Sequence, residues 1–94
     1  MPLLVFATIT ARPGAETALK AGLQELVTQV RTEAACQFYE LYKSTEHPGQ
    51  FIMHEMWQDE AGLLAHSQMP HMKAFGAKAS EWLASPPALT KVNL

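Results

Sequence analysis

Cysteine is almost absent from this chain, whose 94 residues include only Cys36. A single cysteine cannot form an intramolecular disulfide framework. This usage is typical of a reducing compartment, and we therefore expect a cytoplasmic protein. The first six residues are apolar, but they include no basic leader, and Thr8, Thr10 and Arg12 soon interrupt the run. We expect neither a signal peptide nor a membrane span there.

Charge is also scarce. Only 17% of the residues are charged, the net charge is −2, and the seven Lys and Arg residues are scattered rather than clustered. A nucleic-acid-binding surface needs a basic patch or stripe, so no nucleic-acid partner is expected. The chain also lacks a glycine-rich phosphate loop and a nucleophile elbow, so dinucleotide or flavin binding has no support.

Hydrophobic residues are abundant, at 48% of the chain. The length predicts one domain over residues 1–94. A domain of this size buries only about 60–68% of the surface that its unfolded chain exposes. The surplus apolar surface favours a second copy of the chain as a partner.

Seven elements are predicted from hydrophobic periodicity and from turn residues. Their order, β-α-β-β-α-α-β, predicts an α+β fold with a ferredoxin-like layout and a split second helix. The strands are Leu3 to Ala11, a hairpin of Cys36 to Lys43 and Phe51 to Trp57, and a last strand from Leu89 to Leu94. The first helix has an apolar face from Ala15 and Ala18 to Val30, and a short second helix is capped by Asp59 and runs to Ala65. A third helix begins at Pro70, with Met72, Phe75, Ala79, Trp82 and Leu83 on one face.

The strands have apolar residues on both faces. Leu3 and Val5 alternate with Leu4 and Phe6, and Ile52 and Met56 point away from Phe51 and Met53. Helices cover only one face of a ferredoxin-like sheet, so the other face should be polar in a monomer. We therefore predict a homodimer in which two sheets pair face to face across a two-fold axis.

Three segments together resemble the antibiotic biosynthesis monooxygenase (ABM) family over essentially the whole chain. They are Ala7 to Gly14, Glu55 to Ala61 with its Glu-x-Trp start, and His66 to Phe75 with its His-x4-His-x3-Phe spacing. The third looks closest to quinol-monooxygenase-like members. The resemblance implies a dimeric α/β barrel that oxidises a quinol-like or phenolic small molecule with O2 and uses no metal, haem or flavin.

Two departures from the family pattern matter. Ala34-Ala35 stand where the family usually has Pro-Gly, so that turn should differ. By spacing, the Asn, Trp and His of the haem-degrading branch would fall on Ala7, His66 and Gly76, and none matches. Haem degradation is therefore not implied.

His66 and His71 are the candidate catalytic residues. Histidine titrates near neutral pH, and a base that removes a phenolic proton makes the substrate a better electron donor to O2. The structural alternative is that His66 lies at the end of a helix, where the helix dipole favours an imidazolium, and that His71 is a surface residue of the next helix. Metal binding has weak support, because five residues along one helix turn the rings about 140° apart and no third ligand stands at a recognisable spacing. Pro70 breaks the helix between the two histidines, however, and can bend the chain so that both rings converge on a substrate.

Four further residues are candidates for binding the substrate. Glu55 could orient a substrate hydroxyl, although a structural ion pair is the alternative. Trp57, Phe75 and Tyr39 could form an aromatic wall, although aromatic residues at this spacing more often belong to the core. Cys36 has no basic neighbour that would activate its thiol, and His54 has no predicted role.

Two functions remain beside the monooxygenase. One is a non-catalytic small-ligand-binding or stress-associated dimer that uses the same pocket. The other is an isomerase or lyase acting on a small carbonyl compound. Oxygen uptake with a panel of hydroquinones separates the first function from these two.

Overall fold

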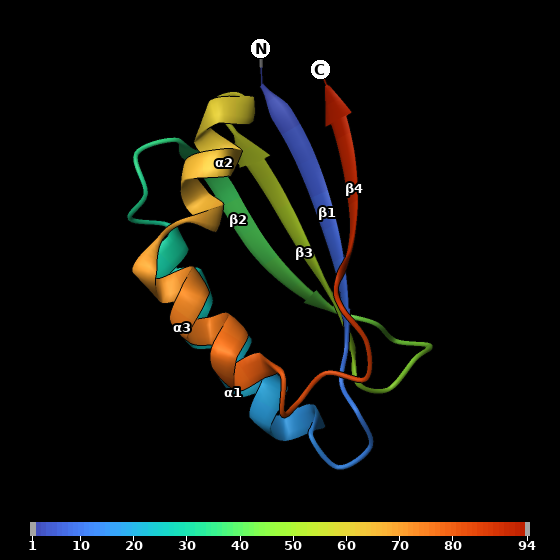
Figure 1. Cartoon of the computed structure of the whole chain (residues 1–94). Coiled ribbons are helices and arrows are strands. Elements are labelled where there is room, and N and C mark those ends of the chain that lie inside the picture. Colours follow the sequence, from blue (N-terminus) through green and yellow to red (C-terminus); the bar gives the residue numbers. More distant parts are fainter. Residues whose placement is uncertain (1, 94) are drawn as a thin grey trace.

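The computed structural model describes residues 2–93, and its elements follow the expected order (Figure 1). The strands are β1 (Leu3–Thr10), β2 (Cys36–Lys43), β3 (Gln50–Trp57) and β4 (Ala88–Asn93), and the helices are α1 (Glu16–Val30), α2 (Glu60–Ser67) and α3 (Pro70–Ala79). None of these helices is both long and apolar enough to cross a membrane. Leu94, the expected last strand residue, lies outside the described residues.

The four strands form one antiparallel sheet in the order β2-β3-β1-β4. The three helices lie together on one face of this sheet, and α1 and α3 pack against each other (Figure 1). The ferredoxin-like α+β fold expected from the sequence is therefore confirmed.

The core lies between the sheet and the helices. Strand β1 alternates strictly between buried and half-buried residues, because successive side chains of a strand point to opposite faces. Its buried side chains meet the apolar stripe of α1, which consists of Leu19, Leu23, Leu26, Val27 and Val30. Ala18, which was expected on that stripe, is exposed. The longer Leu19 takes the buried position beside it.

The opposite face of the sheet is apolar and has no helix over it. Leu4, Phe6, Ile52 and Met56 are only half-buried there. The ring of His54 stacks on Phe6 with their centroids 4.8 Å apart and also belongs to this face. The prediction that the strands are apolar on both faces is therefore confirmed.

The C-terminal helix is shorter than its apolar pattern predicted. Helix α3 ends at Ala79, so the expectation that Trp82 and Leu83 share its face was wrong. Leu83 instead forms a bridge with Ala11, and the carbonyl of Trp82 accepts from the backbone N–H of Arg12. The segment that follows α3 is thus bound to the end of β1, and this contact fixes where the loop that leads to β4 begins.

Helix α2 begins as the sequence predicts. The side chain of Asp59 accepts a hydrogen bond from the backbone N–H of Gly62 at 2.8 Å, which satisfies a donor that has no partner within the helix. Gly62 is needed at this point, because a Cβ atom there would lie 2.6 Å from the Cβ of Ala35. This end of α2 is thereby held close to the loop between α1 and β2.

We expect Asp59→Ala to lower the free energy of unfolding by about 1 kcal/mol, because the N-cap acceptor is lost. This corresponds to a decrease of about 4–8 °C in melting temperature for a domain of this size. Asp59→Asn is the control, since its amide oxygen can still accept from Gly62. Equal melting curves for the two variants at one protein concentration would contradict this account of the helix start.

Candidate functional site

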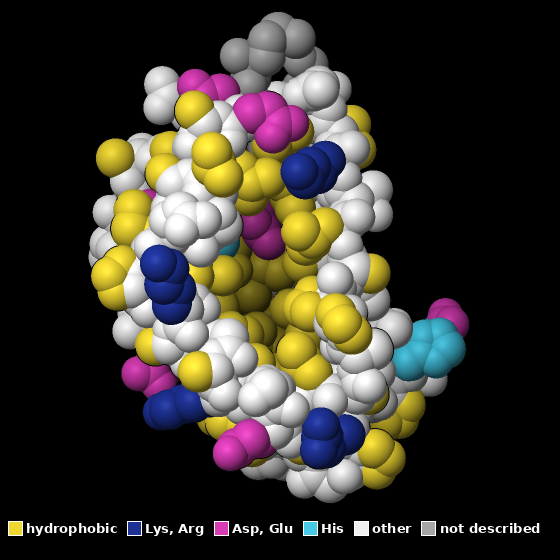
Figure 2. Space-filling view, in the orientation of Figure 1, with side chains coloured by type: hydrophobic (Ala, Val, Ile, Leu, Met, Phe, Trp, Pro, Cys, Tyr) yellow, Lys and Arg dark blue, Asp and Glu magenta, His cyan; other side chains and the backbone are white. Residues whose placement is uncertain are grey.

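A cavity of about 860 Å³ opens between the sheet and the helices. Figure 2 looks into it and shows hydrophobic side chains over most of its wall, with acidic and histidine side chains among them. Its floor is the inner face of β1 and β3, and α2 and α3 form one side. Apolar residues that line it include Val5, Ala7, Ile9, Leu26, Met53, Leu63, Met72 and Phe75, and Leu89 and Lys91 of β4 also reach it.

Glu55 is a buried carboxyl on the cavity wall, with only 5% of its surface exposed. The indole N–H of Trp57 donates to it at 2.9 Å, since residues two apart on a strand face the same side. Burial raises the pKa of Glu55 to about 7, opposed by this hydrogen bond and assisted by the charge of Glu33. Its protonation therefore changes near neutral pH, as a general base requires.

Two other ionisable groups near the cavity stay protonated. Burial raises the pKa of Tyr39 far above its ordinary value, with the charge of Glu55 as the next cause. Tyr39 lines the cavity, and its hydroxyl can act there as a hydrogen-bond donor. Burial, together with the charges of Glu33 and Glu55, raises the pKa of Cys36 to about 11, which agrees with the inert thiol predicted from the sequence.

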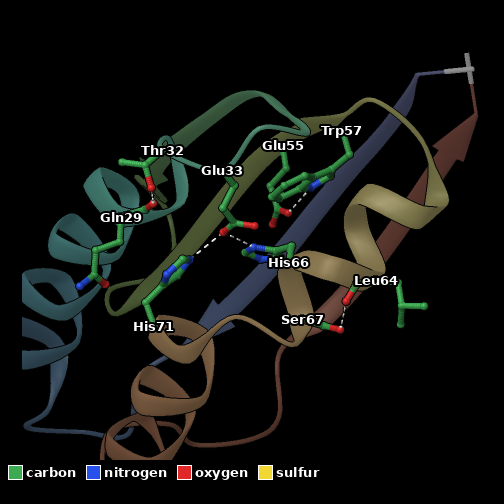
Figure 3. Close-up of polar contacts among 9 residues, drawn as sticks. All are labelled: Gln29, Thr32, Glu33, Glu55, Trp57, Leu64, His66, Ser67 and His71. Atoms are coloured by element: carbon green, nitrogen blue, oxygen red, sulfur yellow. Dashed lines mark hydrogen bonds and ion pairs between the residues drawn. The ribbon is translucent and has the colours of Figure 1, made fainter.

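The polar centre of the site is Glu33, which lies in the loop after α1. One of its oxygens, Oε2, lies 2.9 Å from Nδ1 of His66 and 2.7 Å from Nε2 of His71 (Figure 3). The side chain of Glu33 is 4% exposed, that of His66 7% and that of His71 17%. Two rings from two helices therefore converge on one buried carboxylate.

The loop that presents Glu33 is held by its own hydrogen bonds. The backbone N–H of Glu33 donates to the carbonyl of Val30, and the carbonyl of Glu33 accepts from the N–H of Cys36. Arg31 donates to the backbone carbonyl of Tyr39 and forms an ion pair with Glu40. These contacts bind the loop to β2 and direct Glu33 inward.

The break between α2 and α3 brings the histidines together. His66 lies in the last turn of α2, and the extended backbone of Met69 followed by Pro70 starts α3 in a new direction. The convergence predicted from the helix break at Pro70 is therefore present, and the divergence of about 140° expected along one continuous helix does not apply. No third group stands at a recognisable spacing in the sequence, yet the fold places Glu33 between the two rings.

The ring of His66 is fixed on two sides. Its centroid lies 4.4 Å from that of the Trp57 ring, and its Nδ1 faces Glu33. Its other nitrogen, Nε2, has no hydrogen-bond partner among the described residues. Every fully buried side-chain nitrogen in this part of the chain has a partner, so Nε2 is not fully buried. Nε2 must therefore reach open space, and the cavity is the space that His66 lines.

The structure separates the six candidate residues into two groups. His66, Glu55, Tyr39 and Phe75 line the cavity. His71 does not line it, and instead borders a small groove between α1 and α3. Trp57 is fully buried and acts on the cavity only through Glu55 and His66. His71 and Trp57, which were predicted to act beside a substrate, thus do not line this cavity.

Glu33 was missed as a site residue by the sequence reasoning. A signal for it exists, because Leu26, Val30 and Glu33 follow one another in steps of four and three along the buried stripe of α1. A carboxylate that continues an apolar stripe must be buried, and a buried carboxylate needs a partner. That argument would have directed attention to the histidines.

Glu33, His66 and His71 are also the described residues whose donor types suit a transition metal, and their three donor atoms lie within 4.8 Å of one another. Both nitrogens, however, meet a single carboxylate oxygen at hydrogen-bond distances. An ion would have to replace both hydrogen bonds, and the group contains no fourth protein ligand to close a structural site. We assign the three residues to hydrogen bonding.

Comparison with known proteins identifies the family. The sequence profile described as "Antibiotic biosynthesis monooxygenase" matches residues 2–78, and the chain belongs to this family. Two relatives, both named as putative monooxygenases, are Rv0793 of Mycobacterium tuberculosis and YcnE of Bacillus subtilis. Rv0793 is 34% identical over 95% of this chain and 87% of its own, and YcnE is 28% identical over 98% and 97%.

Solved structures agree with this assignment. The structure of Rv0793 superposes with a TM-score of 0.92 at 32% identity, over 100% of this chain and 95% of that one. The crystal structure of PA3566 from Pseudomonas aeruginosa gives a TM-score of 0.93 at 33% identity, over 99% and 93%. The resemblance predicted from the three sequence segments is thus confirmed.

The buried Glu55 predicts an unusual dependence of stability on pH. Its pKa is about 7 in the folded protein and near 4.5 in the unfolded chain, so the folded protein binds more protons between these values. Stability therefore falls as the pH rises from about 4.5 to 7. We expect Glu55→Gln, which removes this ionisation, to be more stable than the parent at pH 8 by on the order of 1–3 kcal/mol.

Urea unfolding at pH 5 and pH 8 measures this difference. At pH 5 the advantage of Glu55→Gln over the parent should be small. The exposed Glu25 of α1 provides the control, because Glu25→Gln should have the same small effect at both pH values. An equal effect of Glu55→Gln at both pH values would show that burial does not raise this pKa.

Proposed function

We propose that this protein is a cofactor-independent monooxygenase that oxidises a quinol-like or phenolic small molecule with O2. The observation that supports this best is a large apolar cavity whose buried wall contains two proton acceptors, Glu55 and Nε2 of His66. An aromatic substrate matches the apolar wall, and its hydroxyl matches the polar end. Membership of the ABM family agrees with this chemistry.

The first step is removal of the phenolic proton. Glu33 accepts a hydrogen bond from Nδ1 of His66, which leaves the lone pair of that ring on Nε2. Nε2 accepts the substrate proton, and the phenolate then reacts with O2 to form a peroxide on a ring carbon. The electrons come from the substrate, so no flavin, haem or metal is needed.

The second step uses Glu55. The His66 imidazolium protonates the outer peroxide oxygen, and the Glu55 carboxylate removes the ring C–H proton as the O–O bond breaks. One oxygen remains as the new carbonyl of a quinone, and the other leaves as hydroxide, which takes the proton from Glu55 and becomes water. Both residues return to their starting protonation states.

A proton-shifting isomerase or lyase is the second candidate function. The same pair, a carboxyl with a pKa of about 7 and a neutral imidazole, suits proton transfer beside a carbonyl group. Such a reaction consumes no O2. Oxygen uptake with a panel of hydroquinones and phenols therefore distinguishes the two, and uptake above the uncatalysed rate supports the monooxygenase.

We expect His66→Ala and Glu55→Gln each to lower turnover by about 10²–10⁴, the usual contribution of a positioned acid–base group. The parent rate should rise with pH through about 7, because the Glu55 carboxylate must be ionised. An oxygen electrode measures both effects. His54→Ala is the control, since His54 lies on the opposite face of the sheet and its loss should leave turnover within a few-fold of the parent.

We also propose a homodimer formed by the uncovered face of the sheet. Phe6, Ile52 and Met56 lie half-exposed on this face, and Tyr42 and Val92 are 49% and 41% exposed. Such a contiguous apolar surface needs a partner, and a second copy of the same face is complementary across a two-fold axis. The interface should exceed about 1,000 Å² and be largely apolar.

Phe6→Asp should decrease the dimer population or unfold the chain, because it places a charge in the centre of the apolar face. Light scattering at micromolar concentration measures the mass. Leu64→Asp is the matched control, because Leu64 is a 66% exposed apolar residue on α2, away from this face. A monomer mass for the parent protein would contradict the dimer.

A further inference from the structure

The two histidines on Glu33 face different spaces. His66 lines the cavity, whereas His71 borders the groove between α1 and α3, whose other ionisable residues are Glu25 and Lys78. The side chain of His71 is more exposed than that of His66, 17% against 7%. One carboxylate therefore connects an inner ring to an outer ring that solvent can reach.

Glu33 can stabilise one positive charge but not two. Its side chain is almost fully buried, and a buried carboxylate is most stable beside a single cation. Protonation of both rings would leave an uncompensated positive charge in the interior. Each ring donates an N–H to Oε2 even when it is neutral, so the charge can lie on either ring without loss of a hydrogen bond.

In residues 2–93, no cation other than the two histidine rings forms an ion pair with Glu33. Glu55 of β3 and Tyr39 of β2 face His66 from the sheet, and neither of them is a cation. Arg31, the cation nearest in sequence, is engaged with Glu40 and with the carbonyl of Tyr39. The protonation of one histidine must therefore oppose that of the other.

We propose that His66, Glu33 and His71 exchange charge as a unit. The inner ring, His66, gains a proton from the cavity as the outer ring, His71, releases one to solvent. Before the exchange, His71 is an imidazolium, Glu33 a carboxylate and His66 neutral. After it, Nε2 of His66 holds the cavity proton, and Nδ1 of His71 has lost its proton to water in the groove. The sum of the three charges is zero in both states.

This arrangement makes His71 and Glu33 positioning residues rather than groups that touch a substrate. A proton enters the cluster at His66, on the cavity side, and an equivalent proton leaves at His71, whose Nε2 lies 2.7 Å from the same Glu33 oxygen. The buried site never acquires a net charge, so the inner base avoids the cost of an unpaired ion. Only the source of the cavity proton depends on the proposed function.

The test is a pH titration of the histidine ring protons by NMR in the whole protein, with no substrate present. In the parent, His66 and His71 should titrate as a coupled pair, each curve showing two steps. In His71→Gln the amide can still donate to Glu33 but cannot become charged. His66 should then titrate in one step, with its midpoint higher by about one pH unit or more, because it no longer shares the carboxylate.

His54→Gln is the matched control and should leave both curves unchanged. Glu33→Gln should move the midpoints of both rings to lower pH and abolish the two-step form, since the shared negative charge is lost. The proposal is overturned if His66 titrates identically in the parent and in His71→Gln, or if it does not titrate at all before the protein unfolds. These results are independent of turnover, so an absence of O2 uptake would reject the monooxygenase without affecting this test.

Discussion

A carboxylate removed from water must be paired, and Glu33 satisfies that requirement with two histidines from two helices. This one interaction joins the loop after α1, the last turn of α2 and the first turn of α3. It also determines which nitrogen of His66 is free in the cavity. The position of α2 over the sheet and the chemistry of the cavity therefore depend on the same oxygen atom.

Much of the fold could be predicted because it depends on local patterns. Strict alternation put Glu55 and His54 on opposite faces of the sheet, and the structure shows that Glu55 is the one that faces the helices. The spacing of Leu19, Leu23 and Leu26 predicted α1. These properties repeat over two or four residues, so neighbouring residues are enough to read them.

The parts of the site that could not be predicted depend on contacts between residues far apart in the sequence, which a repeating local pattern does not reveal. Glu33 and His71 are 38 residues apart, and their contact requires the angle between α2 and α3 that Pro70 introduces. Trp82 continues an apolar stripe beyond the residue at which α3 ends, because tertiary contacts with Arg12 take over its backbone. Contacts that form across a turn or a helix break, such as the contact between Glu33 and His71, therefore cannot be located from a local sequence pattern.

Strand β4 is more exposed than the other strands and lies at an edge of the sheet. All of its residues are exposed and its only neighbour in the sheet is β1, yet Leu89 and Lys91 reach the cavity. Glu55 and His66, by contrast, come from β3 and α2, and Glu33 comes from the loop after α1. Under the proposed function, substitutions in β4 can change the shape and charge of this edge of the cavity without replacing Glu55 or His66, so substrate range can diverge during evolution while those two residues are retained.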